Sequence, residues 1–146
     1  MFKLLIHINH MFCFAILVKN FYYIFMEIKK INLKNKLSKF NDLWSPKIIS
    51  MMNDYQFKLA KIKGNFIWHD HNSTDETFIV IKGEMIMKLE NGDILVKEGE
   101  MIVIPKGTKH KPTANEECHI LVVEPKGIIN TGDEVNKLTI NDETWI

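Results

Sequence analysis

The chain has 146 residues, of which 46% are hydrophobic and 25% are charged, and its formal net charge is +1. This length accommodates one domain with a buried core and is too short for two domains of ordinary size. The composition is that of a globular protein and not of a disordered one. The near-neutral charge gives no electrostatic reason to expect a nucleic-acid partner, and none is predicted. All 19 basic residues are lysines, so the chain offers no guanidinium group for planar recognition of a phosphate.

The first 25 residues differ in composition from the rest of the chain. They are rich in phenylalanine and isoleucine and contain no acidic residue. A transmembrane helix needs about 20 mostly apolar residues, but two histidines, a lysine and an asparagine interrupt this run and leave Met11–Val18 as its longest apolar stretch. A signal peptide would use Lys3 as its basic end, but no small-residue cleavage site follows.

A third interpretation is that Met26 is the true start and that residues 1–25 are translated upstream sequence. If residues 1–25 are instead an anchor, the lysines after them would hold its carboxyl side in the cytoplasm. Both interpretations place the domain in the cytoplasm, and a membrane contact is expected only with a genuine anchor. The two cysteines, Cys13 and Cys118, form no disulfide framework, which also favours a reduced, intracellular protein.

Residues 26–60 are predicted to form a flank that includes the first strands. Leucines and a phenylalanine recur at helical spacing over 32–44, which predicts a short amphipathic helix with Asn32 as its cap. The Ser45–Pro46 pair is expected to end this helix, because the residue before a proline avoids the helical conformation. After Pro46 the apolar residues recur with the period of two that is typical of strands.

The middle of the chain contains short apolar runs separated by glycine, asparagine and proline. Asn91–Gly92 indicates a two-residue hairpin turn, because such a turn requires positive φ. Many short strands at regular spacing predict an all-β fold, an antiparallel sandwich or barrel. The tail, 126–146, is less periodic, and its apolar end is expected to be tied down. The predicted strands are 47–52, 55–62, 65–71, 76–82, 85–90, 93–98, 101–105 and 118–124.

One stretch, FIWHDHNSTDET, carries residues that bind metals. Side chains two apart on a strand share a face, so His69 and His71 are expected to point the same way, opposite to Phe66. If residues 72–75 connect two antiparallel strands, Glu76 returns close to His71. Two imidazoles and a carboxylate suit a divalent transition metal. A fourth ligand is offered by His110, which follows a turn marked by a proline and a glycine.

The spacing of these residues resembles the first motif of the cupin superfamily, G-x5-H-x-H-x3,4-E-x6-G. His69, His71, Glu76 and Gly83 stand at the motif spacing, whereas only four residues separate Gly64 from His69, one fewer than in the motif.

The second cupin motif, G-x5-P-x-G-x2-H-x3-N, is matched at Gly99, Pro105, Gly107 and His110. Its final asparagine is replaced by Ala114. That asparagine is not a metal ligand in the family, so the substitution does not affect the expected metal site. Fifteen residues separate Gly83 from Gly99, which is the short gap of small single-domain members.

The resemblance is strong over about 65–125 and weaker over the flanks. It implies a conserved jelly-roll-like barrel, a double-stranded β-helix, whose core is placed at 61–125. It also implies that one divalent transition metal (Mn, Fe, Ni, Co or Zn) is held by His69, His71, Glu76 and His110. Small cupins usually pair, so the resemblance further implies a homodimer.

Other polar residues near the motifs have simpler interpretations. His119 is expected to be an outward, hydrogen-bonded histidine, and its neighbour Cys118 a small buried residue and not a reactive thiol. Lys109 and Lys111 flank His110 and are expected in solvent. Asp75 is expected to be exposed, with support of a metal ligand through a hydrogen bond as the alternative. The face of 76–82 opposite Glu76 is apolar and needs a cover, either from residues 26–60 or from a second subunit.

Two hypotheses about function follow. The first is a metal-dependent enzyme acting on a small molecule in the barrel, of dioxygenase or isomerase type, since open metal positions can bind substrate. The alternative is a non-catalytic module that binds a metal or ligand. Small chains of this kind also resemble proteins labelled mannose-6-phosphate isomerase-like, but the absence of arginine argues against the phosphomannose isomerase reaction itself. No catalytic residue beyond the metal ligands is predicted.

Overall fold

The computed structural model describes residues 28–132, 134, 136–140 and 144–146. The chain divides into two units, Met1–Lys30 and Ile31–Ile146, and the account below concerns the second. The interpretations of residues 1–25 therefore concern residues outside those described, and the proposed division into 26–60, 61–125 and 126–146 stays a prediction. In the part that is described, no helix has the length and apolar character needed to cross a membrane.

The predicted helix is present but shorter than expected. Helix α2 spans Leu33–Leu37, and the side chain of Asn32 caps it by accepting a hydrogen bond of 3.0 Å from the backbone N–H of Asn35. The prediction that Ser45–Pro46 ends the helix is wrong, because the helix ends at Leu37. The polar residues that follow include a serine whose hydroxyl donates to the backbone carbonyl of Asn35 instead of supporting another turn.

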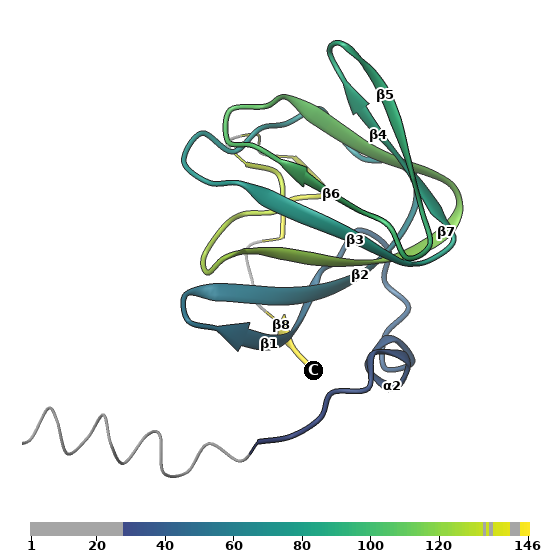
Figure 1. Cartoon of the computed structure of the whole chain (residues 1–146), viewed down its shortest axis with the longest axis vertical. Helices are drawn as coiled ribbons and strands as arrows, with labels where there is room; N and C mark the ends of the chain where they lie inside the picture. Colours follow the sequence, from purple (N-terminus) through teal and green to yellow (C-terminus); the bar gives the residue numbers. More distant parts are fainter. Residues whose placement is uncertain (1–27, 133, 135, 141–143) are drawn as a thin grey trace, which may run out of the picture. The chain divides into compact units, whose positions relative to one another are not determined.

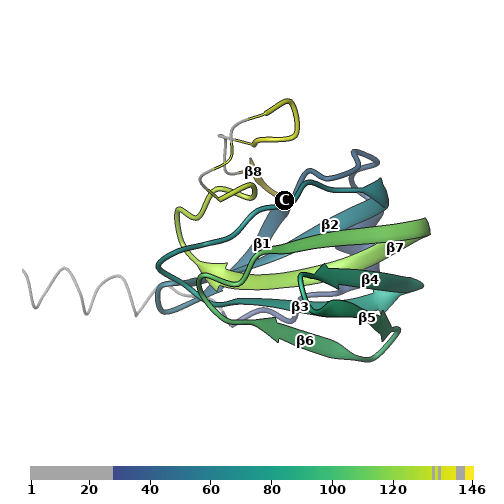
Figure 2. The ribbon, with the colours of Figure 1, turned by 90° about the horizontal axis from the view of Figure 1, so that it is seen from above.

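The rest of the unit is built from strands, which confirms the all-β prediction. Figures 1 and 2 show them curling around a common interior. Adjacent strands pair antiparallel, except for a parallel pair formed by the first and last strands. The strands are β1 (Lys47–Met52), β2 (Tyr55–Asn65), β3 (Glu76–Lys82), β4 (Glu84–Leu89), β5 (Gly92–Lys97), β6 (Met101–Ile104), β7 (His110–Pro125) and β8 (Thr144–Trp145).

The long strand β7 organises the sheet. One of its edges pairs with β2, and the other pairs with β4 over its first residues and with β3 over its last. The path of paired strands runs β5-β4-β7-β2-β1-β8, with β6 joined to β3, so the described strands form a jelly-roll-like fold whose sheet does not close. Strand β7 begins at His110, which pairs with Leu89 of β4.

The strand predicted over 65–71 is absent, and so is its hairpin with 76–82. Strand β2 extends to Asn65, and its register with β7 shifts between Ile62 and Gly64. Gly64 has φ 77°, outside the range of a regular strand, and marks this bulge in β2. Beyond Asn65 the chain leaves the ladder and makes one isolated bridge, from His69 to His110. Alternation in the sequence alone did not distinguish this irregular segment from a strand.

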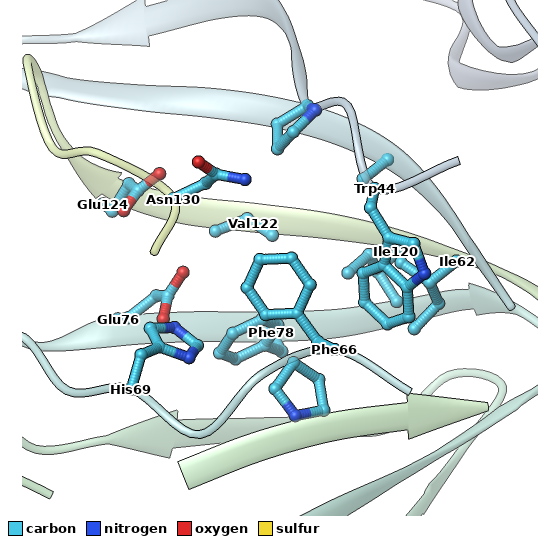
Figure 3. A pocket seen from close by; sticks show the side chains of 13 residues that line it. Trp44, Ile62, Phe66, His69, Glu76, Phe78, Ile120, Val122, Glu124 and Asn130 are labelled. Atoms are coloured by element: carbon cyan, nitrogen blue, oxygen red, sulfur yellow. The ribbon is translucent and has the colours of Figure 1, made fainter. Parts of the chain in front are cut away.

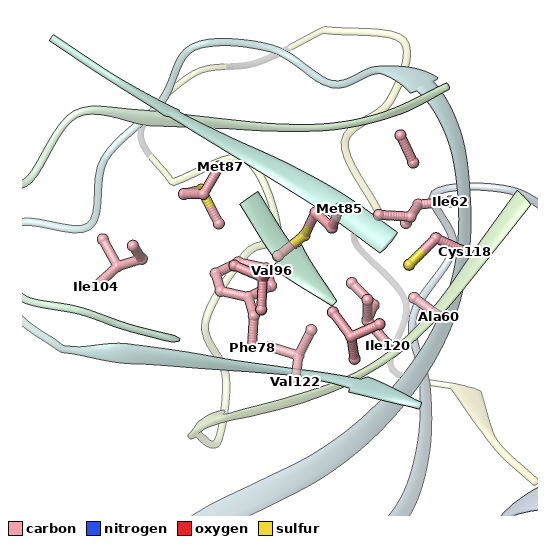
Figure 4. Close-up of a cluster of buried hydrophobic side chains, with 12 residues drawn as sticks. Ala60, Ile62, Phe78, Met85, Met87, Val96, Ile104, Cys118, Ile120 and Val122 are labelled. Carbon is pink, nitrogen blue, oxygen red and sulfur yellow. The ribbon is translucent and has the colours of Figure 1, made fainter. Parts of the chain in front are cut away.

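The inner face of the sheet carries the main core. On β3 the inward residues are Glu76, Phe78 and Val80, as the alternation predicts. Strands β2 and β7 are buried over runs of successive residues, since their alternate side chains pack in the inner and in the outer cluster. Figure 4 shows the side chains of the inner cluster meeting from opposite strands. The cluster is almost fully excluded from water and consists of Ala60, Ile62, Phe78, Val80, Met85, Met87, Val96, Ile104, Ala114, Cys118, Ile120 and Val122.

The apolar outer face of β3 is covered from within the same chain. Ile79 and Ile81 pack against a second cluster that includes Leu37 from α2 and Phe40 from the segment after it. Of the two alternatives for this cover, the structure supports the one in which residues 26–60 fold over the sheet. Leu37 and Phe40 are 6% and 7% exposed, so their burial ties α2 to the sheet.

Candidate metal centre

The predicted ligand residues converge on one point inside the sheet. One ligand atom from each of His69, His71, Glu76 and His110 lies within 4.8 Å of the others. All four residues are buried, with between 1% and 8% of their surface exposed. Glu76 is the first residue of β3 and His110 the first of β7, whereas both other histidines lie on the irregular segment between β2 and β3.

Backbone hydrogen bonds fix the irregular segment against the turn before β7. The N–H of Phe66 donates to the carbonyl of Pro112 at 3.0 Å, and the N–H of Gly107 donates to the carbonyl of His71 at 2.9 Å. Asp75, which was expected in solvent or beside a ligand, accepts a hydrogen bond of 2.9 Å from the backbone N–H of Lys106. The two cupin motifs therefore lie side by side, and this pairing replaces the predicted hairpin.

Two of the imidazoles are oriented by their own backbone. Nδ1 of His69 lies 3.2 Å from the carbonyl oxygen of Ile67, and Nδ1 of His110 lies 2.8 Å from that of Thr108. A carbonyl oxygen only accepts, so each Nδ1 carries the proton. The lone pair of each imidazole is consequently on Nε2, the atom left to coordinate a metal.

The distances between the donor atoms at the centre fit coordination of one metal ion better than direct hydrogen bonds between the side chains. Oε2 of Glu76 lies 3.5 Å from Nε2 of His71 and 3.3 Å from Nε2 of His110. None of these three atoms makes a hydrogen bond within the described residues, although all are buried. Ligands bound at about 2.0–2.2 Å to one ion are separated by about 3.0–3.4 Å. Three imidazoles and one carboxylate suit several divalent transition metals and leave coordination positions open.

The electrostatics of the centre keep Glu76 and His69 in the metal-binding form, whereas for His71 burial is outweighed by the adjacent Glu76, which raises the pKa. Burial and the neighbouring His110 together lower the pKa of His69 to about 4. Burial raises the pKa of Glu76, but the adjacent His110 and His71 outweigh that effect and hold it at about 2. Near neutral pH the carboxylate is therefore ionised and His69 is neutral, as metal coordination requires.

A narrow cavity of about 40 Å³ opens beside the cluster. His69 and Glu76 form one part of its wall, and apolar side chains such as Phe66 and Phe78 form most of the rest (Figure 3). Phe66 thus faces the cavity, which corrects the prediction that it points away from the histidines. Trp44 stacks on Phe66 with ring centroids 4.9 Å apart and closes the apolar end.

Sequence reasoning missed a second acidic residue that lines this cavity beside the cluster. Glu124 is 2% exposed and forms an ion pair of 3.0 Å with Lys58 of β2. Burial raises the pKa of Glu124 to about 7, and the charge of Glu76 adds to the effect. The signal was present, because Glu124 follows Ile120 and Val122 on the inward face of an alternating strand.

The remaining polar residues near the motifs lie outside the cluster. Cys118 is fully buried, and burial raises the pKa of its thiol to about 11, in line with the predicted inert residue. His119 lies 2.8 Å from a carboxylate oxygen of Glu117 on the outer side of β7. Lys109 is exposed and Lys111 is partly buried.

Fold and cluster together define a β-sandwich protein with an internal His-His-Glu-His site, and comparison with known proteins gives its family. The family described as Cupin domain matches residues 57–124, the span from β2 to β7. The chain is 37% identical over 79 residues to YdbB of Bacillus subtilis, a match that covers 53% of this chain and 70% of that protein. The chain belongs to the cupin family.

A solved structure supports the same assignment. A cupin-2 domain containing protein from Shewanella frigidimarina shares 52% sequence identity with a TM-score of 0.65, covering 66% of this chain and 94% of that one. The 3-hydroxyanthranilate 3,4-dioxygenase 2 of Aspergillus oryzae is 40% identical over 60 residues, which are 38% of this chain. The chain spans only 34% of that dioxygenase. The finer label, mannose-6-phosphate isomerase-like, stays a prediction.

Proposed function

We propose that this protein is a metal-dependent cupin enzyme that acts on a small molecule in the cavity beside the cluster. His69, His71, Glu76 and His110 bind one divalent transition metal, and the cavity leads to its open positions. The observation that carries this proposal is the buried meeting of four donor atoms within 4.8 Å. Buried polar atoms normally have partners, so three such atoms that make no hydrogen bond support a role as ligands of a cation.

The protein's own residues orient the metal ligands and exclude water from the cavity. When bound, a divalent metal supplies Lewis-acid polarisation of a substrate oxygen. The backbone carbonyls of Ile67 and Thr108 hold the imidazoles of His69 and His110 with Nε2 toward the centre. Phe66 and Phe78 line the cavity, so a bound substrate is surrounded by apolar surface and separated from bulk water.

We favour a dioxygenase reaction over an isomerase reaction. Support comes from the similarity to proteins named as 3-hydroxyanthranilate 3,4-dioxygenases from several organisms. That similarity covers about a third of those proteins, so their substrate is a candidate here and nothing more. The absence of arginine disfavours a sugar phosphate, since no guanidinium group is available to hold the phosphate.

The test begins with metal content. Purified protein and the variants His71→Ala and His119→Ala are analysed for bound transition metals. We expect about one metal per chain in the wild type and in His119→Ala, and almost none in His71→Ala. Oxygen uptake is then followed with 3-hydroxyanthranilate, diketones, flavonoids and sugar phosphates. Uptake that depends on substrate and on His71 supports the dioxygenase. Bound metal without turnover of any compound supports the non-catalytic alternative.

The proposal also includes a homodimer in the cytoplasm. Met101 and Val103 of β6 continue the outer face of β3 beyond the cover provided by α2. They are 58% and 48% exposed, so the apolar surface there is left to a second copy. Analytical ultracentrifugation of the protein and of a Met101→Lys variant tests this, with a dimer expected only in the wild type.

A further inference from the structure

The end of the cavity at the metal cluster holds further polar residues. Glu124 and Asn130 lie across the cavity from Glu76 and His69 (Figure 3). Because β3 pairs with β7 from Thr77–Val123 onward, Glu124 is the cross-strand neighbour of Glu76. The amide of Asn130 is already committed to the tail, since it donates to the carbonyl of Leu138 at 2.9 Å and accepts from the N–H of Ile140 at 2.9 Å. Of the two, Glu124 is therefore the residue whose bonding is incomplete.

One oxygen of Glu124 is paired and the other is not. Oε1 lies 3.0 Å from Nζ of Lys58, whereas Oε2 is buried and has no hydrogen-bond partner among the described residues. The side chains of Glu124 and Lys58 are 2% and 8% exposed. Replacing a buried ion pair by apolar residues is often neutral or stabilising, so stability alone does not account for charged groups at this position.

We propose that Glu124 positions the substrate by accepting, at Oε2, a hydrogen bond from a hydroxyl group of the substrate. The inference rests on the proposed function, because another group of the substrate is taken to lie at the metal. It narrows the substrate to a small molecule that carries an oxygen-containing group for the metal and a hydroxyl group close to that group. Glu124 acts here as a positioning residue and takes no part in bond making.

The charges and the space around Glu124 favour this class of substrate. Lys58 already balances the charge of Glu124, so a neutral hydroxyl fits better than an ammonium group, which would leave a net positive charge buried. The next inward side chains on the same two strands, Phe78 and Val122, are apolar and offer no other polar contact. The cavity volume of about 40 Å³ favours a small substrate.

The experiment uses the cobalt(II)-loaded protein and two probes of nearly the same shape. Hydroxyacetohydroxamate and propionohydroxamate share a metal-binding head and differ in a terminal hydroxyl against a methyl. Binding is followed by the visible absorption of cobalt. The variants are Glu124→Gln, the double variant Lys58→Met with Glu124→Leu, which leaves no unpaired buried charge, and Glu90→Gln as an exposed control. Cobalt content and melting temperature are measured for each.

At a pH of about 8.5, above the pKa of about 7 of Glu124, the wild type and Glu90→Gln are expected to bind the hydroxyl probe about tenfold more tightly than the methyl probe, the value of one hydrogen bond to a charged acceptor. The double variant is expected to bind both probes equally, and Glu124→Gln, which keeps an acceptor oxygen, to retain part of the preference. A folded double variant with the wild-type preference, or a cobalt-loaded wild type with no preference, overturns the role of Glu124. Failure of the wild type to bind cobalt would instead overturn the proposed metal function on which this role depends.

Discussion

His69 and His110 are joined by a reciprocal pair of backbone hydrogen bonds, in which each N–H donates to the carbonyl of the other, at 3.0 and 2.9 Å. Their rings lie 4.2 Å apart, centroid to centroid. This bridge brings together residues that are 41 positions apart in the sequence. The main chain, and not a network of side chains, therefore sets the separation of the two motifs at the candidate metal site.

Asp75 supports the same arrangement from the edge of the site. Its carboxylate accepts a hydrogen bond of 2.9 Å from the backbone N–H of Lys106, in the turn that precedes His110. We expect Asp75→Ala to lower the free energy of unfolding by about 1 kcal/mol and to weaken metal binding several-fold. Chemical denaturation and metal titration measure the two effects. Asp93→Ala, which removes a surface ion pair of 2.8 Å in the β4–β5 hairpin, serves as control and should leave metal affinity unchanged.

The tail packs against the segment that carries His71. A methyl group at Gly132 would lie 1.9 Å from the carbonyl oxygen of Asp70, and Gly132 also has φ 58°. Gly132→Ala is therefore expected to displace the peptide before His71, to lower stability by more than about 1 kcal/mol and to reduce metal affinity at least tenfold.

The matched control for Gly132→Ala is Gly127→Ala. Gly127 also has positive φ, 81°, but a methyl group there meets no atom within 4 Å. It should lose stability through backbone strain alone and keep its metal affinity. Equal metal affinities for the two variants would contradict the contact between the tail and the site.

The stability of the metal-free protein should depend on His69. In the unfolded chain this imidazole takes up a proton near its ordinary pKa of 6.5, whereas in the folded protein its pKa is lowered to about 4. Between these values the unfolded state binds more protons, so stability falls as the pH is lowered from about 6.5 to 4. The loss contributed by His69 is on the order of 3 kcal/mol.

Urea unfolding of chelator-treated protein at a series of pH values measures this dependence. His69→Gln should flatten the slope between pH 6.5 and 4, because glutamine takes up no proton. His119→Ala, a change on the outer side of β7, should leave the slope as in the wild type. A wild-type protein whose stability is constant over this range would show that His69 is not held in its neutral form by burial.

Helix α2 is expected to stabilise the sheet through Leu37. This side chain is 6% exposed and packs in the cluster that covers the outer face of β3. We expect Leu37→Ala to lower the free energy of unfolding by about 2–4 kcal/mol, as for other buried leucines. Leu43→Ala, at a position that is 43% exposed, should cost much less, and thermal melting of the two variants makes the comparison.

The local sequence was sufficient to predict the structure where the period of two continued over a whole strand. The alternation of β3 gave the inward positions of Glu76, Phe78 and Val80, and the motif spacing selected the histidines that converge with Glu76. The alternation depends on only a few neighbouring residues, and the motif spacing is a pattern that the family shares. The all-β class and the Asn91–Gly92 hairpin were predictable for the same reason.

Features set by contacts between distant segments were not predictable. Residues 66–71 alternate like a strand, but hydrogen bonds to the turn at 105–112 and the bend at Gly64 hold them in another conformation. The role of Glu124 depends on Lys58, which lies on a neighbouring strand far away in the sequence. The cover of β3 by α2 was one of two alternatives, since periodicity shows that a face is apolar but not what packs on it.

The most direct test is anomalous diffraction at the absorption edge of the metal, from crystals of the metal-loaded protein. A single strong peak should lie about 2.0–2.2 Å from three imidazole nitrogens and one carboxylate oxygen, those of His69, His71, His110 and Glu76. A peak elsewhere on the molecule, or no peak in crystals soaked with manganese, iron, nickel, cobalt and zinc in turn, would contradict the proposed site.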